Sequence, residues 1–289
     1  MANLKTAFIG LGVMGYPMAG HLQAKGFATT VYNRTTAKAE KWAQEHGGGF
    51  HATPAGASNG ADVVCVCVGN DDDLRSVVLG ADGVLAGMKP GAILCDHTTA
   101  SANVARELAA AAKDKGFGFL DAPVSGGQAG AENGQLTVMV GGERATFDMA
   151  KPVMDSYGKA VTLMGPAGSG QLTKMVNQIC IGGLVQALSE GLAFSRNAGL
   201  DSHLVLDVIG KGAAQSWQMD NRGHTMVDGK FDFGFALDWM IKDLGMCLDE
   251  AARNGSNLEI TTLVKGFYEE LSAGGKGRMD TSSLIQRLT

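Results

Sequence analysis

The chain has 289 residues, 45% of them hydrophobic and 18% charged, with a formal net charge of −5 at pH 7. This length and composition predict a globular protein of about two domains. Its acidic balance and scattered cations exclude a nucleic-acid surface, and no apolar run approaches the roughly 18 residues that a membrane span needs. The first apolar stretch begins almost at Met1, which leaves no room for a signal peptide, so we expect a cytoplasmic protein without membrane partners.

The first expected strand, Thr6–Ile9, runs directly into a glycine-rich turn. Three glycines in this spacing expose backbone N–H groups and a helix N-terminus, an arrangement that suits a pyrophosphate. An ordinary strand-to-helix turn remains the alternative in a chain with 42 glycines. The cofactor-binding candidates of this turn are Gly10, Leu11, Gly12, Val13, Met14 and Gly15.

The second expected strand, Ala28–Tyr32, ends about 20 residues beyond the glycines, where a dinucleotide-binding fold contacts the adenosine ribose. NAD-binding proteins usually carry an acid there. This chain has Asn33, Arg34 and Thr35, which offer an amide, a guanidinium and a hydroxyl. We therefore expect these three residues to bind NADPH or NADP in preference to NAD, with NAD still possible. The alternative is that Arg34 only caps a solvent-facing strand end.

Apolar runs alternate with helical stretches through the first half of the chain, and this alternation predicts a doubly wound parallel sheet in a dinucleotide-binding domain of residues 1–164. The further strands and possible extensions are Val63–Val68, Ala92–Cys95, Phe117–Leu120, Leu136–Val140 and Val161–Met164. Residues 165–289 lack strand-like runs and predict an all-helical domain for substrate binding and oligomerisation. The long helical stretch Gln171–Ala198 is expected to link the two domains.

Several residue types predict structure without chemistry. Gly182, Gly183 and Gly191 indicate close packing of the long helix. The six histidines show no metal-ligand spacing, so no metal is expected. Asp71–Asp73 is interpreted as a solvated turn. The cysteines have no CxxC spacing and are expected to be buried free thiols: Cys65, Cys67, Cys95, Cys180 and Cys247.

Two segments could carry chemistry. Ser125, Gly126 and Gly127 follow the fifth expected strand, where a hydroxyl and unobstructed N–H groups could hold a carboxylate, although a plain turn is the alternative. Lys174 lies one turn into the long helix. Desolvation beside a second cation, with Lys242 as the candidate, could lower the pKa of its amine into a useful range for acid–base work. A solvated surface lysine is the alternative for each position.

Taken together, these motifs resemble the β-hydroxyacid dehydrogenases along essentially the whole chain. The matching segments are Phe8–Ala19, Asp121–Gly127, Gly170–Asn177 and Lys242–Leu244. The resemblance implies a Rossmann-type α/β domain followed by an all-α domain. It also implies that Lys174 is the catalytic residue, that Ser125–Gly127 holds the substrate, and that Thr99 and Lys242 contact the cofactor.

Other expected contacts follow from position. Val68, at the end of the third strand, is expected to contact the cofactor, and Phe235 and Asp243 the substrate. Asn177 and Gln178 lie three and four residues beyond Lys174, and which of them contacts substrate stays open. Phe235 and Trp239 could set the length of the pocket, with aromatic core positions as the alternative.

The expected activity is hydride transfer between NADP(H) and a short 3- or 4-hydroxy acid or its semialdehyde, a small-molecule carboxylate, with Lys174 as general acid and base. Three alternatives remain. They are a non-catalytic NADPH-binding sensor, an imine reductase on the same scaffold, and a decarboxylase similar to 6-phosphogluconate dehydrogenase. Aromatic residues in Phe231–Trp239 suggest a homodimer or homotetramer.

Overall fold

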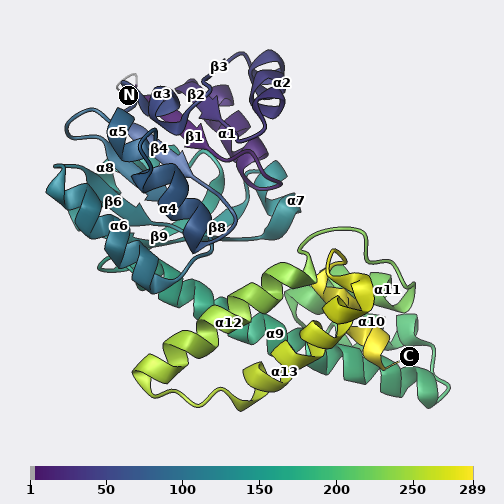
Figure 1. Cartoon of the computed structure of the whole chain (residues 1–289). Coiled ribbons are helices and arrows are strands. Elements are labelled where there is room, and N and C mark those ends of the chain that lie inside the picture. Colours follow the sequence, from purple (N-terminus) through teal and green to yellow (C-terminus); the bar gives the residue numbers. More distant parts are fainter. Residues whose placement is uncertain (1–3, 289) are drawn as a thin grey trace. The chain divides into compact units, whose positions relative to one another are not determined.

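The computed structural model describes residues 4–288. The chain divides into two compact units, Met1–Lys174 and Met175–Thr289. The first unit is an α/β domain and the second is helical (Figure 1). The α/β fold with a following helical part, expected from the sequence, is confirmed.

Within the described residues, one nine-stranded sheet forms the centre of the first unit. Its strand order is β3-β2-β1-β4-β5-β6-β8-β7, and β9 pairs with β8. Strands β1 to β6 all run parallel to their neighbours among themselves, so their carboxyl ends meet at one edge. The strands are β1 (Lys5–Ile9), β2 (Ala28–Tyr32), β3 (Gly49–Phe50), β4 (Val63–Val66), β5 (Ile93–Asp96), β6 (Gly118–Asp121), β7 (Val124–Ser125), β8 (Leu136–Gly142) and β9 (Gly158–Gly165).

The sheet departs from the sequence-based expectation at its far side. Strand β8 extends the sheet as predicted, but it runs antiparallel to both β6 and β7. Between β6 and β8 the chain passes through β7 and α7 (Gly127–Glu132). The connection from β7 to β8, residues 126–135, is shorter than the dozen or more residues that a parallel crossover needs, so β8 pairs antiparallel with β7.

Helices cover both faces of the sheet (Figure 1). One face packs against α1 (Gly15–Ala24), α2 (Thr36–His46), α7 and α8 (Arg144–Met154) in a core that includes Met18 and Trp42. The other face packs against α3 (Pro54–Ser58), α4 (Asp71–Leu79), α5 (Val84–Gly87) and α6 (Ala102–Asp114) around Leu74 and Leu108. Strands covered on both faces explain the continuous apolar runs, such as the fully buried residues of β4.

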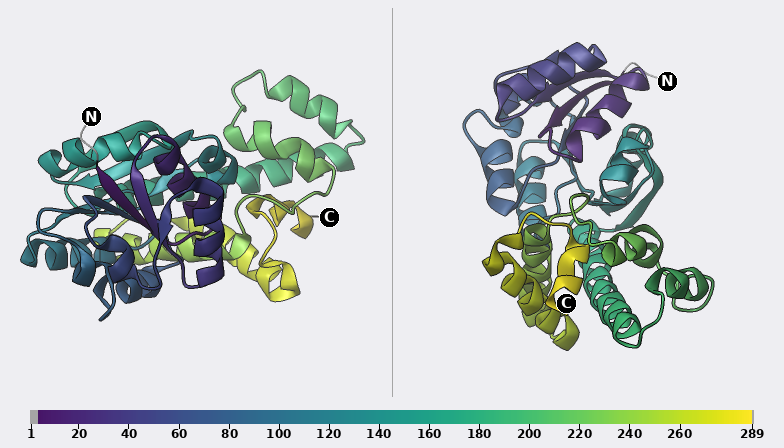
Figure 2. Two further views of the ribbon diagram at one scale, coloured as in Figure 1. Left: turned by 90° about the horizontal axis from the view of Figure 1, so that it is seen from above. Right: turned by 90° about the vertical axis from the view of Figure 1, so that its right-hand side faces the viewer.

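The second unit is built along α9 (Ser169–Asn197), whose first residues belong to the first unit. One apolar cluster joins Val185 of α9 to α12 (Leu237–Asn254) and α13 (Glu259–Leu271), and a second joins Leu188 and Leu192 to α10 (Ser202–Ile209) and α11 (Trp217–Val227). Figure 2 shows these helices in green to yellow. The chain then continues through η1 (Ser272–Lys276) and η2 (Thr281–Arg287).

Three local expectations are wrong or incomplete. A Cβ at Gly182 would lie 3.5 Å from the side chain of Leu244, but a Cβ at Gly191 would meet no atom within 4 Å, so Gly191 marks no close packing. Cys180 is exposed on α9, whereas three of the other four cysteines are buried and one is half-buried. The acidic segment Asp71–Asp73 is the first turn of α4, where carboxylates are stabilised by the helix dipole.

Candidate active site

The glycine turn between β1 and α1 lies at the carboxyl edge of the sheet, and two of its glycines are required by the chain itself. Gly10 has φ +96°, and a Cβ there would lie 2.2 Å from the carbonyl oxygen of Cys67. A Cβ at Gly15 would lie 2.0 Å from the carbonyl oxygen of Gly10. These close approaches let α1 begin immediately against β1.

Gly12 differs from its neighbours, because a Cβ there would meet no atom within 4 Å and its φ lies outside the left-handed region. Nothing within the described part of the chain therefore requires glycine at this position. A dinucleotide-binding turn requires it for a different reason, since the pyrophosphate approaches the backbone at the second glycine. The backbone at Gly12, beside the start of α1, is therefore open to the close approach of a pyrophosphate.

Asn33 connects the glycine turn to the end of β2. Its Oδ1 accepts the backbone N–H of Leu11 at 3.0 Å, and its Nδ2 donates to the carbonyl oxygen of Thr35 at 3.2 Å. The side chain of Leu11 is fully buried, so this residue contributes to the turn through packing and its bonded N–H. Val13 is 56% exposed and Met14 lies half-buried on the same turn.

Arg34 extends from the same segment with its side chain 90% exposed. Its Nη1 lies 3.7 Å from Oδ1 of Asp73, in the first turn of α4. An exposed pair at this distance contributes little to stability. A phosphate could therefore displace this weak pair and bind the guanidinium bidentately. Thr35 occupies the exposed position before α2.

The ends of β4 and β5 are joined by a hydrogen-bonded loop. Thr98 accepts the backbone N–H of Val68 through its hydroxyl oxygen at 3.0 Å, and its own N–H donates to Oδ1 of Asp96 at 2.9 Å. Thr99 follows as a half-buried residue. The loop that contains Thr99 is therefore hydrogen-bonded to Val68, and both residues are predicted cofactor contacts.

Ser125, Gly126 and Gly127 form the sharp turn from β7 into α7. Ser125 pairs with Thr137 of β8, while Gly126 and Gly127 have φ of +129° and +62°. A side chain at either glycine would be strained by these dihedral angles. The turn therefore has a conformation that suits glycine and places no side chain at two successive positions, as an anion-binding turn needs.

Helix α9 carries Lys174, and the start of this helix is hydrogen-bonded to the end of strand β6. Asp121, at the end of β6, accepts the backbone N–H of Gly168 on Oδ1 at 2.7 Å and that of Gln171 on Oδ2 at 2.9 Å. Asp121 is fully buried, and Lys174 is 8% exposed. Burial raises the pKa of the Asp121 carboxyl, while these N–H donors oppose the shift.

In the second unit, the remaining predicted residues form a chain of polar contacts. Asn177 donates to Oε1 of Gln178 at 2.7 Å, and Gln178 donates to Oδ2 of Asp243 at 2.7 Å. Lys242 Nζ lies 3.3 Å from Oδ1 of Asp243 and 5.5 Å from the ring centre of Trp239. Both Gln178 and Asp243 are at most 3% exposed. The structure thus brings Asn177, Gln178, Lys242 and Asp243 together.

Phe235 lies outside that polar chain. It is half-buried beside the core of α12 and α13, and its backbone N–H donates to Oδ2 of Asp280 at 2.9 Å. Asp280 is 1% exposed and also binds Arg222, whose Nε lies 3.2 Å from Oδ1. These bonds fix the segment before α12.

A buried polar network lies beneath the carboxyl edge. His97 Nδ1 lies 2.7 Å from the carbonyl oxygen of Ala122, and Nε2 lies 2.8 Å from the hydroxyl of Tyr157. Since a carbonyl only accepts, Nδ1 carries a proton, and in the neutral ring Nε2 accepts from Tyr157. Cys65 Sγ lies 3.7 Å from the same hydroxyl. Hydrogen bonds therefore join β4, the loops after β5 and β6, and the chain before β9.

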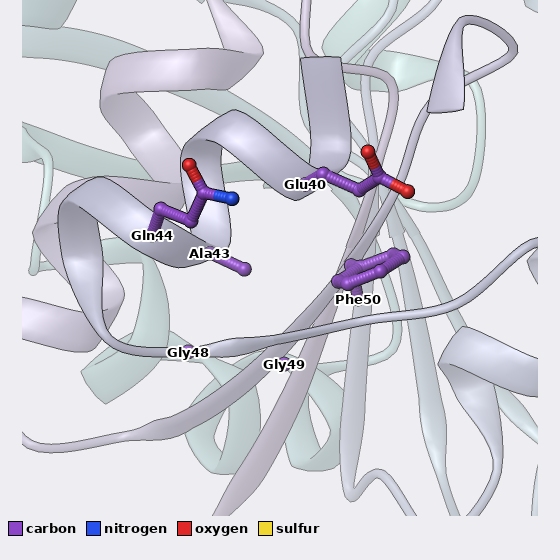
Figure 3. A pocket seen from close by; sticks show the side chains of 6 residues that line it. All are labelled: Glu40, Ala43, Gln44, Gly48, Gly49 and Phe50. Carbon is purple, nitrogen blue, oxygen red and sulfur yellow. The ribbon is translucent and has the colours of Figure 1, made fainter. Parts of the chain in front are cut away.

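Two cavities of the first unit do not mark this site. One, of about 520 Å³, lies between α2 and β3 (Figure 3) and is lined by Glu40, Ala43, Gln44, Gly48, Gly49 and Phe50. The other, of about 380 Å³, is lined mainly by the first residues of β1, β2 and β3. Neither cavity is lined by a residue of the glycine turn.

Two further structural findings concern metal sites and membrane spans. No group of three or more histidine, cysteine or acidic side chains in residues 4–288 is placed to hold a metal ion. No helix in that part of the chain is long and apolar enough to cross a membrane.

Sequence reasoning missed the buried polar residues that hold the site. Asp121 lies inside a matching motif but had no predicted role, and neither had Gln171 or Asp96. Their partners are backbone groups that lie far away in the sequence, for example 47 residues between Asp121 and Gly168. The position of Asp121 at the end of an apolar strand was a signal in the sequence, but the sequence could not identify the backbone groups that this carboxylate binds.

A glycine turn at the carboxyl edge of a parallel sheet, with open space over its second glycine, defines a dinucleotide-binding protein. Comparisons identify the class further. Residues 5–165 match the family model described as the NAD binding domain of 6-phosphogluconate dehydrogenase, and residues 168–288 match that described as NAD-binding of NADP-dependent 3-hydroxyisobutyrate dehydrogenase.

Whole-chain relatives agree with these matches. The chain is 62% identical over 284 residues to an uncharacterized oxidoreductase of Shewanella frigidimarina, covering 98% of each protein. It is 32% identical over 285 residues to 2-hydroxy-3-oxopropionate reductase of Escherichia coli, covering 99% of this chain and 97% of that protein. The structure of Mycobacterium tuberculosis 3-hydroxyisobutyrate dehydrogenase with L-serine matches with a TM-score of 0.89 at 29% identity, covering 99% of each chain.

The chain belongs to the β-hydroxyacid dehydrogenase family, as its motifs indicated. It is accordingly an oxidoreductase that uses a nicotinamide cofactor.

Proposed function

We propose that the chain interconverts a short 3- or 4-hydroxy acid and its semialdehyde with NADP(H), using Lys174 as general acid and base. One observation carries the assignment. Asp121 and Gln171 bind the first turn of α9 to the carboxyl edge of the sheet, so Lys174 is held at the same edge as the glycine turn and the Thr98–Ala100 loop.

Lys174 performs the proton transfer in this proposal. The nicotinamide cofactor, when bound, supplies the hydride for reduction or accepts it in oxidation. In reduction, the Lys174 ammonium donates a proton to the carbonyl oxygen of the semialdehyde. In oxidation, the neutral amine removes the proton from the hydroxyl group. A positioned acid or base of this kind contributes a factor of about 10² to 10⁴ in rate.

Ser125, Gly126 and Gly127 hold the substrate carboxylate. The dihedral angles of the two glycines favour a turn without side chains at these positions, so their N–H groups can donate, and the Ser125 hydroxyl adds a third donor. We propose a three- or four-carbon semialdehyde as the substrate. The names of the Escherichia coli reductase and the Mycobacterium tuberculosis dehydrogenase support acids of this size.

Of the two amides beyond Lys174, we assign substrate contact to Asn177. Gln178 is 3% exposed and uses both ends of its amide, accepting from Asn177 and donating to Asp243. Asn177 is half-buried, and its side-chain oxygen is the group that we assign to a substrate hydroxyl. In this arrangement Gln178 and Asp243 orient Asn177 and Lys242, and we assign Lys242 to contact with the nicotinamide.

NADP(H) is the preferred cofactor in this proposal. Asn33 stands where NAD-binding folds usually place an acid, and Arg34 is an exposed guanidinium next to it. The glycine turn, Val68 and Thr99 bind the rest of the dinucleotide. The family model described for an NADP-dependent dehydrogenase supports this choice.

We also propose a homo-oligomer. In the expected segment Phe231–Trp239, Phe231 is only 7% exposed, whereas Trp239 is 38% exposed. Further large apolar side chains are exposed on α9 and α10, including Phe194 at 73%, Leu204 at 59% and Val208 at 63%. Apolar surface of this kind favours association. Light scattering should give a dimer or tetramer, and a monomer would contradict the proposal.

A steady-state screen tests the function. NADPH and NADH are offered with glyoxylate, succinic semialdehyde, 2-hydroxy-3-oxopropionate and methylmalonate semialdehyde, and NADP with serine and 3-hydroxyisobutyrate. We expect turnover of at least one short semialdehyde with NADPH. Tight NADPH binding without turnover of any of them would contradict the proposal and favour a sensor, and turnover of a cyclic imine alone would favour an imine reductase.

A further inference from the structure

Gln171 joins the catalytic helix to the loop after β5. Its side chain is fully buried, its Nε2 donates to the carbonyl oxygen of Thr98 at 2.7 Å, and its Oε1 accepts the N–H of Ala100 at 3.1 Å. The two bonds lie on either side of Thr99. A carbonyl only accepts and an N–H only donates, so this amide fits in one orientation only.

The other end of Gln171 is held as well. Its backbone N–H donates to Oδ2 of Asp121 at 2.9 Å, next to the bond from Gly168 to Oδ1. Both acceptor oxygens of a buried carboxylate thus hold the start of α9. Gln171 is therefore fixed through its backbone to β6 and through its side chain to the loop after β5.

The loop in turn is bonded to the end of β4. The Thr98 hydroxyl oxygen accepts the N–H of Val68, and the Thr98 N–H donates to Asp96. Starting from α9, hydrogen bonds therefore run through Gln171 and Thr98 to Val68. Lys174 stands three residues beyond Gln171, which is about 4.5 Å along the helix axis.

We propose that Gln171 is a positioning residue that fixes Lys174 relative to the Thr98–Ala100 loop and hence to the cofactor held by Thr99 and Val68. This inference rests on the proposed role of Lys174. Without the Gln171 bonds, the start of α9 would be held less rigidly, and the Lys174 amine could move relative to the reacting atoms. A misplacement of about 1 Å can lower a rate by about 10²-fold, so such a bond affects turnover more than cofactor binding.

The chemistry at position 171 is specific to an amide. Gln171→Met keeps a similar volume but leaves the Thr98 carbonyl and the Ala100 N–H without their buried partner. Gln171→Glu places a second acceptor against the Thr98 carbonyl when it is ionised. A protonated glutamic acid has the same shape as glutamine and again offers one donor and one acceptor.

The test compares these two variants with Gln186→Met. Gln186 is also a buried glutamine of α9, but its amide donates to Glu190, one turn further along the same helix. We expect Gln171→Met to lower kcat by about 10- to 100-fold, while the Kd of NADPH, measured by fluorescence, stays within about 3-fold of the wild type. Gln186→Met should match the wild type in both quantities.

Two readouts separate positioning from general damage. Hydrogen exchange of the Ala100 amide, measured by NMR on the cofactor-free protein, should be faster in Gln171→Met and unchanged in Gln186→Met. The activity of Gln171→Glu, relative to the wild type at each pH, should recover as the pH falls and the carboxyl takes up a proton. The pH comparison also serves if the methionine variant fails to fold.

The outcomes are distinguishable from failure of the proposed function. If Ala100 exchange is unchanged in Gln171→Met, or if Gln171→Glu is impaired to the same extent at every pH, the positioning role is wrong. A fall in kcat matched by an equal loss of NADPH affinity also overturns it. If the wild type turns over none of the screened substrates, the proposed function fails, while the exchange measurement still decides whether Gln171 holds the loop.

Discussion

The side-chain oxygen of Asn33 accepts the backbone N–H of Leu11 at 3.0 Å, which joins the end of β2 to the glycine turn after β1. NAD-binding folds place an acid at this strand end, where it binds the 2′-hydroxyl of the ribose. In this chain an uncharged amide occupies the position, so the bond to the turn is kept without a negative charge.

Asn33→Asp should therefore shift the cofactor preference towards NADH. The aspartate can still accept from Leu11, but its charge repels a 2′-phosphate. We expect the ratio of kcat/KM for NADPH to that for NADH to fall by about 10- to 100-fold, equivalent to about 1.4 to 2.7 kcal/mol. An unchanged ratio in paired titrations would show that the 2′-position lies elsewhere.

Asp73→Asn should strengthen NADPH binding. Asp73 pairs with Arg34 at 3.7 Å, so it competes with a 2′-phosphate for the guanidinium. The pair is exposed, and we expect a decrease of about 2- to 5-fold in the Kd of NADPH with little change for NADH. Asp72→Asn is the matched control, because Asp72 is 96% exposed and pairs with Arg75 instead. Equal effects of the two variants would argue for a general charge effect.

Gly12→Ala and Gly15→Ala should separate binding from folding. A Cβ at Gly12 meets no protein atom within 4 Å, so the variant should fold normally and lose about 10-fold or more in NADPH affinity. A Cβ at Gly15 would lie 2.0 Å from the Gly10 carbonyl oxygen, and the clash should cost about 1–3 kcal/mol or more of the free energy of unfolding. Thermal melts with and without NADPH measure both effects. Normal NADPH affinity in Gly12→Ala would contradict the assignment of the pyrophosphate site.

Asp96→Asn should change how stability depends on pH. Burial raises the pKa of the Asp96 carboxyl from 3.8 to about 7, and its Oδ2 has no hydrogen-bond partner among the described residues. An acid with a raised pKa in the folded state holds its proton more tightly there than when unfolded. Its contribution to stability is therefore greatest below about pH 4 and is lost as the pH rises to about 7.

Removing this carboxyl should make the variant progressively more stable relative to the wild type between about pH 4 and about pH 7, by up to about 4 kcal/mol. The oxygen of the introduced amide can still accept from the N–H of Thr98, so the loop is preserved. Urea unfolding at several pH values measures the difference, with the exposed Asp72→Asn as control. A constant difference across this range would mean that Asp96 titrates normally.

Much of the fold could be predicted because local patterns and tertiary structure agree. The glycine turn, the long helix α9 and the apolar strands β1, β2, β4, β5 and β6 follow from spacing and hydrophobicity alone, whereas the two-residue strand β3 was not predicted. The antiparallel placement of β8 could not be predicted in this way, since its apolar pattern would also suit a parallel strand. The direction of pairing depends on the path of the chain between β6 and β8.

The site was predictable to a smaller extent. Motif residues such as Lys174 and Ser125 stand out in the sequence, but the residues that hold them do not. Gln171 looked like an ordinary helical residue, and its partners are backbone atoms more than 70 residues away. Spacing also placed Asn177 and Gln178 on similar faces, and the structure distinguishes the two by the bond from Gln178 to Asp243 and by the deeper burial of Gln178.

The central claim is that Lys174 transfers the proton during hydride transfer, and the most direct test is Lys174→Ala measured in two ways on one preparation. We predict a fall in kcat/KM of about 10² to 10⁴ for the best semialdehyde, with the Kd of NADPH unchanged within about 3-fold. Turnover close to that of the wild type, with NADPH bound normally, would contradict the account.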